Sequence, residues 1–366
     1  MIPLADLKLQ YQSIKSEIDE AIHNCISQGI FINGKIVSDF EDAFAKYIGT
    51  TYCVGCGNGT DALEIILRSL NIGHGDEVIV PALTWISTAE AVNNIGGEPV
   101  FVDINPQSYT IDTKKIEEKI TKKTKAIIPV HLYGCPVDLD ELMRIAEKNN
   151  LFVVEDCAQA HGAEYFGRKV GTFGIASVFS FFPSKNLSAF GDGGAIITNN
   201  KALAESARKI TNHGQLDIKH RHFMVGRNSR LDTLQASILK VKLKYLDSWN
   251  EKRQQNALFY LSRLKENTDL ILPYQENGKK HVYHLFVIRC KHRDKIIDLL
   301  KEENISWGIH YPKPVPLLDA YTYKRHNSED FPVASSVTDE VISIPIYPEI
   351  TSDQLGIICD QLLKYR

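Results

Sequence analysis

The sequence lacks the features that mark membrane, disulfide-stabilised and nucleic-acid-binding proteins. No apolar run approaches the roughly 20 residues that a helix needs to cross a bilayer. The seven cysteines are an odd number and are scattered along the chain, which argues against a disulfide framework. A formal net charge of −3 indicates no basic surface for nucleic acid or for membranes. Low-complexity tracts, internal repeats and long charge runs are also missing.

Targeting and metal signals are equally sparse. The first residues, 1–6, do not follow the charged-then-apolar layout of a signal peptide. Cys53 and Cys56 form one CxxC pair, but no second pair completes a zinc site, so we expect both to be small buried residues around a strand. We therefore expect a soluble, cytoplasmic protein that binds no metal.

What the sequence does contain is a regular alternation of strand and helix patterns. Helical patterns at 61–70, 87–94 and 138–148 separate several of the apolar runs. Continuous apolar strands that alternate with helices predict a mostly parallel sheet covered on both faces. We expect seven strands in one α/β layer structure. The runs are at 51–56, 77–83, 99–104, 126–132, 152–157, 177–181 and 194–198.

The pattern changes after residue 230. Residues 231–264 have a helical period and are expected to link a large domain to a smaller one. Beyond them the sequence predicts a strand over 281–290, a helix over 293–302, a strand over 306–311 and a last helix over 352–364. With 366 residues and 43% hydrophobic content, the chain is long enough for a large α/β domain, 1–250, and a small α+β domain, 251–366.

One lysine stands out chemically. Lys185 lies on a predicted turn between the aromatic-rich run 177–181 and a glycine-rich loop. Neighbouring rings disfavour the ammonium form, and a desolvated lysine has a lowered pKa and becomes a nucleophilic amine. Such an amine suits a Schiff base with an aldehyde, and pyridoxal phosphate is the natural aldehyde. A lysine near aromatic residues is more often a snorkelling side chain, so the interpretation depends on the other residues of the site.

In open parallel sheets, ligands bind beyond the carboxyl ends of the strands, and a glycine-rich segment lies at one such end. Residues 55–61, GCGNGTD, follow the first strand and open a helix. Glycines let a ligand approach the backbone, and free N–H groups at a helix start attract a phosphate. The hydroxyls of Thr60 and Ser180 offer further hydrogen bonds to a phosphate. The alternative for residues 55–61 is a simple N-capped turn.

Two other strand ends carry candidates for binding a cofactor ring. The run 152–156 ends in two acids, and Asp156 is a candidate partner for a protonated pyridine nitrogen, which would keep the ring able to absorb electrons. Gln159, three residues on, is a candidate for the ring hydroxyl. Trp85 offers an apolar platform for the ring. The alternatives are an acid that caps the next helix and a tryptophan in the core.

These motifs resemble the DegT/DnrJ/EryC1/StrS family of pyridoxal-phosphate-dependent sugar aminotransferases. The resemblance runs over nearly the whole chain and rests on GNGTDAL at 57–63, EDCAQAHGA at 155–163, SFFPSKNL at 180–187, GRNSRLD at 226–232 and IHYP at 309–312. It implies an aspartate-aminotransferase-like fold of type I, with a seven-stranded mostly parallel sheet and a smaller C-terminal α+β domain. It also implies a homodimer with both sites at the interface.

The resemblance assigns roles to individual residues. Lys185 would form the Schiff base with pyridoxal phosphate and then shuttle the proton. The remaining cofactor contacts would be Asp156 to the pyridine nitrogen, Gln159 to the ring hydroxyl, Trp85 to the ring face, Gly59, Thr60 and Ser180 to the phosphate, and Asn228 to the phosphate of the neighbouring subunit's cofactor. Candidates for the sugar nucleotide are His310 and Tyr311, with Lys219 and Arg230 for its diphosphate. The alternative for His310 is a hydrogen-bonded histidine that ends a strand.

The loop 185–194 is similar to the branch of the family that aminates C-3 of nucleotide-linked 3-keto-6-deoxyhexoses. This implies transfer of the amino group of L-glutamate to a dTDP-linked keto-deoxysugar, giving a precursor of the Fuc3N or Qui3N type. Alternatives are amination at C-4, a sugar dehydratase of the same cofactor, and a cofactor-binding regulator without turnover. Lys185 argues against the dehydratase, because family members with that activity carry histidine at this position.

Overall fold

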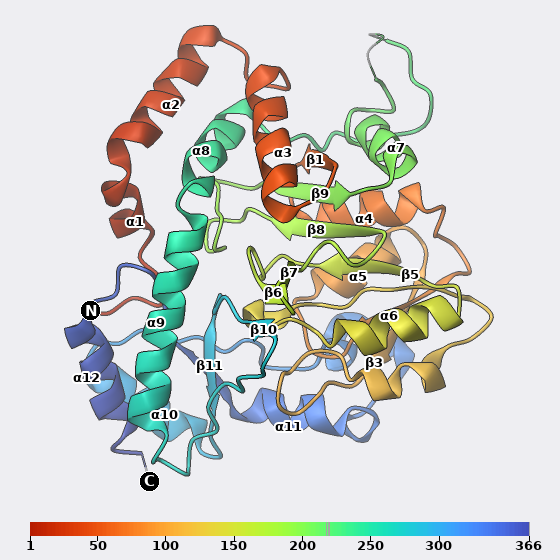
Figure 1. Ribbon diagram of the computed structural model, residues 1–366. Coiled ribbons are helices and arrows are strands. Elements are labelled where there is room, and N and C mark those ends of the chain that lie inside the picture. Colours follow the sequence, from red (N-terminus) through yellow and green to blue (C-terminus); the bar gives the residue numbers. More distant parts are fainter. Residues whose placement is uncertain (217, 219, 366) are drawn as a thin grey trace.

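A seven-stranded sheet forms the centre of the structure (Figure 1). The computed structural model describes residues 1–216, 218 and 220–365. The strands lie in the order β1-β9-β8-β5-β4-β2-β3, and β9 is antiparallel to both of its neighbours whereas the other pairs are parallel. These seven strands correspond to the seven predicted ones. Their bounds are β1 Tyr52–Cys56, β2 Glu77–Pro81, β3 Glu98–Val102, β4 Thr124–Ile127, β5 Phe152–Asp156, β8 Ala176–Ser180 and β9 Gly194–Thr198.

Helices cover both faces of this sheet, because alternate residues of each strand point to opposite sides. Val178 of β8 packs into a core formed with α4 (Gly59–Ser69), α5 (Ser87–Asn94) and α7 (Lys201–Thr211). Its neighbour Phe179 packs into a second core with α3 (Lys35–Ile48) and α8 (Thr233–Leu243). Farther along the sheet, α6 (Leu139–Lys148) covers β4 and β5. The layered α/β prediction is therefore confirmed.

The N-terminal helices lie on the side of the molecule formed by α8 and by the long helix that follows it (Figure 1). Helix α1 is Leu7–Ser13, and α2 (Lys15–Gln28) packs on α8 through Ile18, Ile238 and Val241. The predicted helical segment 231–264 is two helices, because the chain turns between α8 and α9 (Leu246–Leu264) at Lys244 and Tyr245.

The C-terminal part builds a further core around α9 and a two-stranded antiparallel sheet. Strand β11 (Phe286–Arg289) pairs with β12 (Val341–Ile344), and α10 is Arg293–Glu302, α11 Pro332–Glu340 and α12 Ser352–Leu362. The predicted strand over 306–311 is wrong. Only Gly308 forms a bridge there, to Ser343, so the segment pairs with the other edge of β12 at one residue and does not extend into a strand.

Short elements complete the fold. Strands β6 (Glu164–Tyr165), β7 (Arg168–Lys169) and β10 (Lys279–Lys280) form a three-stranded sheet. The 3-10 turns are Thr113–Lys115, Glu117–Lys119, Leu132–Gly134, Val315–Leu317, Asp319–Lys324 and Ser328–Asp330. Across the described residues, no helix combines the length and the apolar content that crossing a membrane requires.

Candidate active site

The predicted site residues follow four strands whose carboxyl ends share one edge of the sheet. Helix α4 begins after β1, Trp85 follows β2, Asp156 ends β5 and Lys185 follows β8. These four strands run in the same direction, since β2, β4, β5 and β8 are mutually parallel and β9 is antiparallel to both β8 and β1. The chain topology therefore brings together residues that lie about a hundred positions apart.

Lys185 carries an amine whose surroundings favour its neutral form. It lies in the loop between β8 and β9, where its N–H donates to the carbonyl of Phe182 at 2.9 Å. The side chain is half-buried. Burial lowers the pKa of Lys185 to about 8, and the charge of Asp156 opposes that shift. The pKa of Lys185 is thus shifted in the direction predicted from the sequence, with burial as the cause.

Asp156 is a buried carboxylate whose two oxygens are held in place. Its Oδ1 accepts the N–H of Ala158 at 3.1 Å, and its Oδ2 accepts the hydroxyl of Thr88 at 3.0 Å. Burial raises the pKa of Asp156, while these two hydrogen bonds and the charge of Lys185 favour the ionised form. A protonated ring nitrogen is the kind of partner that would stabilise this carboxylate further.

The start of α4 offers unused donors for a phosphate. The side chain of Asn58 caps the helix by accepting the N–H of Asp61 at 2.8 Å. The N–H groups of Gly59 and Thr60 have no acceptor among the described residues. A Cβ on Gly59 would lie 3.0 Å from Cβ of Ser180, so only glycine leaves this cradle open. The N-capped turn and the phosphate site are therefore compatible, because the cap uses one donor and leaves two.

Two hydroxyls beside this cradle already have partners in the structure. Thr60 donates its hydroxyl to Ser87 at 2.7 Å, and the hydroxyl of Ser180 accepts the N–H of Phe182 at 3.3 Å. Ser180 therefore keeps its own hydroxyl hydrogen for a phosphate, whereas the hydroxyl hydrogen of Thr60 is already donated to Ser87. Together with the two free N–H groups and the positive end of α4, the hydroxyl of Ser180 fits the phosphate of pyridoxal phosphate.

Trp85 is a surface residue at this edge and not part of the core. Its side chain is 57% exposed, and its ring centroid lies 5.7 Å from that of Tyr311. The hydroxyl of Tyr311 accepts from Nε2 of Gln159 at 3.0 Å, and Oε1 of Gln159 accepts the N–H of Tyr133 at 2.7 Å. The amide of Gln159 is thus fixed with its donor toward Tyr311, and burial raises the pKa of that tyrosine to about 12.

His310 is a hydrogen-bonded histidine, as its structural alternative expects, and the charge of Lys185 also affects its pKa. Its Nδ1 lies 2.8 Å from the hydroxyl of Ser343, and its carbonyl accepts the hydroxyl of Tyr133. Burial, followed by the charge of Lys185, lowers the pKa of His310 to about 4. It is therefore neutral at pH 7, so any contact with a substrate diphosphate would be a hydrogen bond and not an ion pair.

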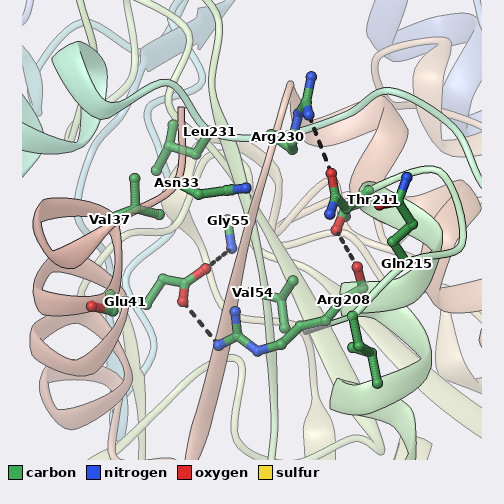
Figure 2. Close-up of a pocket in the computed structure, with 14 residues that line it drawn as sticks. Asn33, Val37, Glu41, Val54, Gly55, Arg208, Thr211, Gln215, Arg230 and Leu231 are labelled. Carbon is green, nitrogen blue, oxygen red and sulfur yellow. Dashed lines mark hydrogen bonds and ion pairs between the residues drawn. The ribbon is translucent and has the colours of Figure 1, made fainter. Parts of the chain in front are cut away.

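Asn228 and Arg230 flank Ser229, whose hydroxyl accepts the N–H of Gly57 at 3.0 Å just before α4 begins. Arg230 donates to Oδ1 of Asn228 at 2.7 Å and to Oδ1 of Asn212 at 3.2 Å. Arg230 also lines a pocket of about 230 Å³ in which Glu41 joins the N–H of Gly55 to Arg208 (Figure 2). None of the Lys185, Asp156 or Trp85 side chains lines that pocket. Lys219 lies outside the described residues.

The other acid of the predicted pair has a structural role. Glu155 accepts the N–H groups of Gly171, Phe173 and Gly174 at 2.7, 2.7 and 2.8 Å, and its Oε2 lies 3.2 Å from Nε2 of His131. Cys157 places its sulfur near these two side chains. Hydrogen bonds already occupy the Glu155 oxygens, so this group anchors the segment 171–174.

Sequence reasoning missed several residues that shape the site. Thr88 orients Asp156, and Tyr133 orients Gln159. Asn186, the residue after Lys185, is held in place by three hydrogen bonds of its own side chain. Asn186 stands inside the motif that carries Lys185, and Thr88 lies three residues after Trp85. For Asn186 and Thr88, the sequence signal was their position close to a predicted site residue. Tyr133 had no such signal, since it follows β4, whose end carried no predicted site residue.

Comparisons with known proteins agree with the predicted family. The model of the DegT/DnrJ/EryC1/StrS aminotransferase family matches residues 12–363. The chain is 45% identical over 365 residues, covering 100% of itself and 99% of the relative, to dTDP-3-amino-3,6-dideoxy-alpha-D-galactopyranose transaminase of Aneurinibacillus thermoaerophilus. It is 42% identical over 355 residues (97% and 95% covered) to UDP-N-acetyl-3-dehydro-alpha-D-glucosamine 3-aminotransferase of Acidithiobacillus ferrooxidans.

Solved structures match equally well. The structure of S. venezuelae DesV in complex with a ketimine intermediate has a TM-score of 0.97 and 40% identity, with 100% of this chain and 98% of that chain covered. Other structures of the same fold contain the cofactor in its PLP or PMP form. The chain therefore belongs to the DegT/DnrJ/EryC1/StrS aminotransferase family and is a pyridoxal-phosphate-dependent sugar-nucleotide transaminase of fold type I.

Proposed function

We propose that this transaminase moves the amino group of L-glutamate to the C-3 keto group of a dTDP-linked 3-keto-6-deoxyhexose, giving a dTDP-3-amino-3,6-dideoxyhexose of the Fuc3N or Qui3N type. The observation that carries this proposal is the similarity over the whole chain to two transaminases whose names both specify position 3. The two relatives differ in nucleotide, so position 3 has more support than dTDP.

Different residues of the site would bind different parts of the cofactor. When bound, pyridoxal phosphate supplies an aldehyde that reacts with amines and a ring that takes up electrons. The free N–H groups of Gly59 and Thr60, with the hydroxyl of Ser180, would bind its phosphate. Asp156 would bind the ring nitrogen and Gln159 the ring hydroxyl, with Trp85 against the ring face.

Lys185 is the group that moves protons. Its amine has a pKa of about 8, so an appreciable neutral fraction is present near neutral pH. The neutral Nζ accepts the α-proton of glutamate and later returns a proton at the carbon that receives the amino group. Asp156 stays ionised opposite the ring nitrogen and does not exchange protons with the substrate.

We propose that the sugar nucleotide contacts the remaining predicted residues. Tyr311 lies against Trp85 and Gln159, so its hydroxyl would contact both cofactor and sugar. The neutral ring of His310 would donate or accept a hydrogen bond with the sugar nucleotide. Lys219 and Arg230 would meet the diphosphate as cations.

The proposed assembly is a homodimer with shared sites. Exposed apolar side chains precede Asn228 in the chain: Phe223 is 47%, Met224 39% and Val225 83% exposed. Covering them would favour association, and Asn228 would then reach the phosphate of the neighbouring subunit's cofactor. Within each subunit, we place the boundary between a large domain, 1–250, and a small one, 251–366, in α9.

Product analysis tests the proposal. Purified protein with pyridoxal phosphate and L-glutamate is given dTDP-linked 3-keto- and 4-keto-6-deoxyhexoses, and a UDP-linked 3-keto sugar, in separate reactions. Mass spectrometry and NMR of the products locate the new amine. We expect amination at C-3 of the dTDP sugar. Faster amination of the 4-keto sugar would contradict the position, and faster amination of the UDP sugar would contradict the nucleotide.

A further inference from the structure

A directed chain of hydrogen bonds passes through Asn186, the residue after Lys185. Asn186 is buried, and its Nδ2 donates to Oδ1 of Asn250 at 2.8 Å and to the carbonyl of Val282 at 3.1 Å. A carbonyl can only accept, so the amide of Asn186 has one possible orientation. Its Oδ1 therefore faces Nδ1 of His284, 3.1 Å away, and that nitrogen must carry the hydrogen.

The chain continues in the other direction to the segment that carries Asp156. Asn250 accepts from Asn186 through Oδ1, and its Nδ2 donates to the carbonyl of His161 at 2.8 Å. His161 ends the segment that begins with Asp156 and contains Gln159. The donors thus run from His284 to Asn186 to Asn250 to the carbonyl of His161, and bonds aligned in this way strengthen one another.

This arrangement joins three separate parts of the chain at one amide. Asn186 comes from the loop between β8 and β9, Asn250 from α9, and His284 from the segment before β11. All three side chains are buried, with exposures of 3%, 2% and 8%. A buried asparagine whose amide is bonded to two other segments, α9 and residues 282–284, fixes its own backbone, and Lys185 is the adjacent residue.

The surroundings of His284 keep its ring neutral, so the Nδ1 hydrogen that bonds to Asn186 is the only N–H of the ring. Burial comes first in lowering the pKa of His284, followed by the positive charges of Lys185 and Arg253 and by the rings of His310 and His161. A neutral ring with its hydrogen on Nδ1 leaves Nε2 without one. No described residue donates a hydrogen bond to that nitrogen.

We propose that Asn186, Asn250 and His284 are positioning residues for the transamination, and that His284 acts on Lys185 through Asn186. The inference deepens the proposed function and rests on Lys185 being the reacting amine. A displaced lysine would lose turnover while the substrates still bind, because proton transfer depends on the position of Nζ more steeply than binding does.

Four variants test the network. Asn186→Ala removes its centre. His284→Asn places an amide nitrogen where Nδ1 stands and keeps the donor to Asn186, whereas His284→Gln places one where Nε2 stands and loses that donor. Asn267→Ala is the matched control, since Asn267 also donates to two carbonyls, of Leu362 and Tyr365, but far along the chain from Lys185.

The readouts are kcat and KM for glutamate in the holoenzyme, the pH midpoint of the absorption band of bound pyridoxal phosphate, and the midpoint of urea unfolding. We expect Asn186→Ala and His284→Gln to lose about 10²-fold in kcat with little change in KM. The pH midpoint of the band should move in the same direction in both. His284→Asn should stay within about threefold of the wild-type kcat, and Asn267→Ala should lose stability only.

The opposite pattern would overturn the inference. If His284→Asn lost as much turnover as His284→Gln, the hydrogen bond to Asn186 would not be the reason for the effect. If Asn186→Ala kept its kcat at the level of Asn267→Ala, the network would only stabilise the fold. A failure of the proposed function would show differently, as a lack of glutamate turnover in the wild-type protein itself.

Discussion

At Lys185, burial and the charge of Asp156 act in opposite directions on the same amine. Burial lowers the pKa of Lys185 to about 8, and Asp156 raises it. Only the neutral amine attacks an aldehyde. Uptake of pyridoxal phosphate by the apoprotein should therefore speed up with rising pH and level off above about pH 8, which stopped-flow absorbance measures.

Removing the charge of Asp156 should shift the pH midpoint of pyridoxal phosphate uptake in a defined direction. In Asp156→Asn, Lys185 loses the group that raises its pKa, so the midpoint of the uptake rate should fall to a lower pH than in the wild-type protein. A midpoint that moved upward, or a wild-type midpoint near the ordinary lysine value of about 10.5, would contradict the assignment.

Gly59 provides a test of the phosphate cradle. A Cβ there would lie 3.0 Å from Cβ and 3.5 Å from Oγ of Ser180 and would push away a hydroxyl proposed to bind the phosphate. We expect Gly59→Ala to weaken binding of pyridoxal phosphate by about tenfold or more, or about 1.4 kcal/mol. Equilibrium titration followed by fluorescence measures this. Gly356→Ala, where a Cβ would meet nothing within 4 Å, should leave the affinity unchanged.

Among the structural elements, the turn after β7 depends on one buried carboxylate. In Glu155→Ala, the N–H groups of Gly171, Phe173 and Gly174 lose their acceptor. Leaving one buried and two half-buried donors unsatisfied should lower the free energy of unfolding by about 3 kcal/mol in urea titrations. The exposed Glu147→Ala is the control, and an equal effect of both changes would contradict the anchoring role.

The elements also show how far sequence reasoning reaches. The seven strands, and the position of the candidate cofactor-binding residues after their ends, were predictable, because apolar runs and glycine-rich helix starts are local patterns. The contacts of Asn186 could not be predicted, because Asn250 and His284 lie 64 and 98 positions away in the sequence. No local sequence pattern around either residue indicates such a contact. The strand predicted over 306–311 is wrong because the pairing of this segment with β12 is limited to Gly308 and Ser343.

At the scale of the whole molecule, shared sites can be tested by mixing two inactive proteins. Lys185→Ala should lose turnover by more than about 10³-fold, because no other group replaces its proton transfer. Asn228→Ala should lose activity by weakening the phosphate contact. If Asn228 acts on the neighbouring subunit, a mixed dimer contains one intact site, and the mixture should regain about a quarter of wild-type activity.

The same mixture distinguishes the two arrangements. If Asn228 served the site of its own chain, each subunit of the mixed dimer would carry one defect and no site would be intact. An inactive mixture that contains mixed dimers, as shown by native mass spectrometry of differently tagged subunits, would therefore contradict the shared site. Light scattering of the wild-type protein should give the mass of two chains of 41.2 kDa each.

The most direct test of the central claim is the absorption spectrum of the purified protein before and after L-glutamate is added. The account predicts a yellow band from pyridoxal phosphate held at Lys185, which bleaches as glutamate gives up its amino group. A yellow protein that does not respond to glutamate would contradict the proposed donor. A colourless protein that takes up no added pyridoxal phosphate would contradict the site itself.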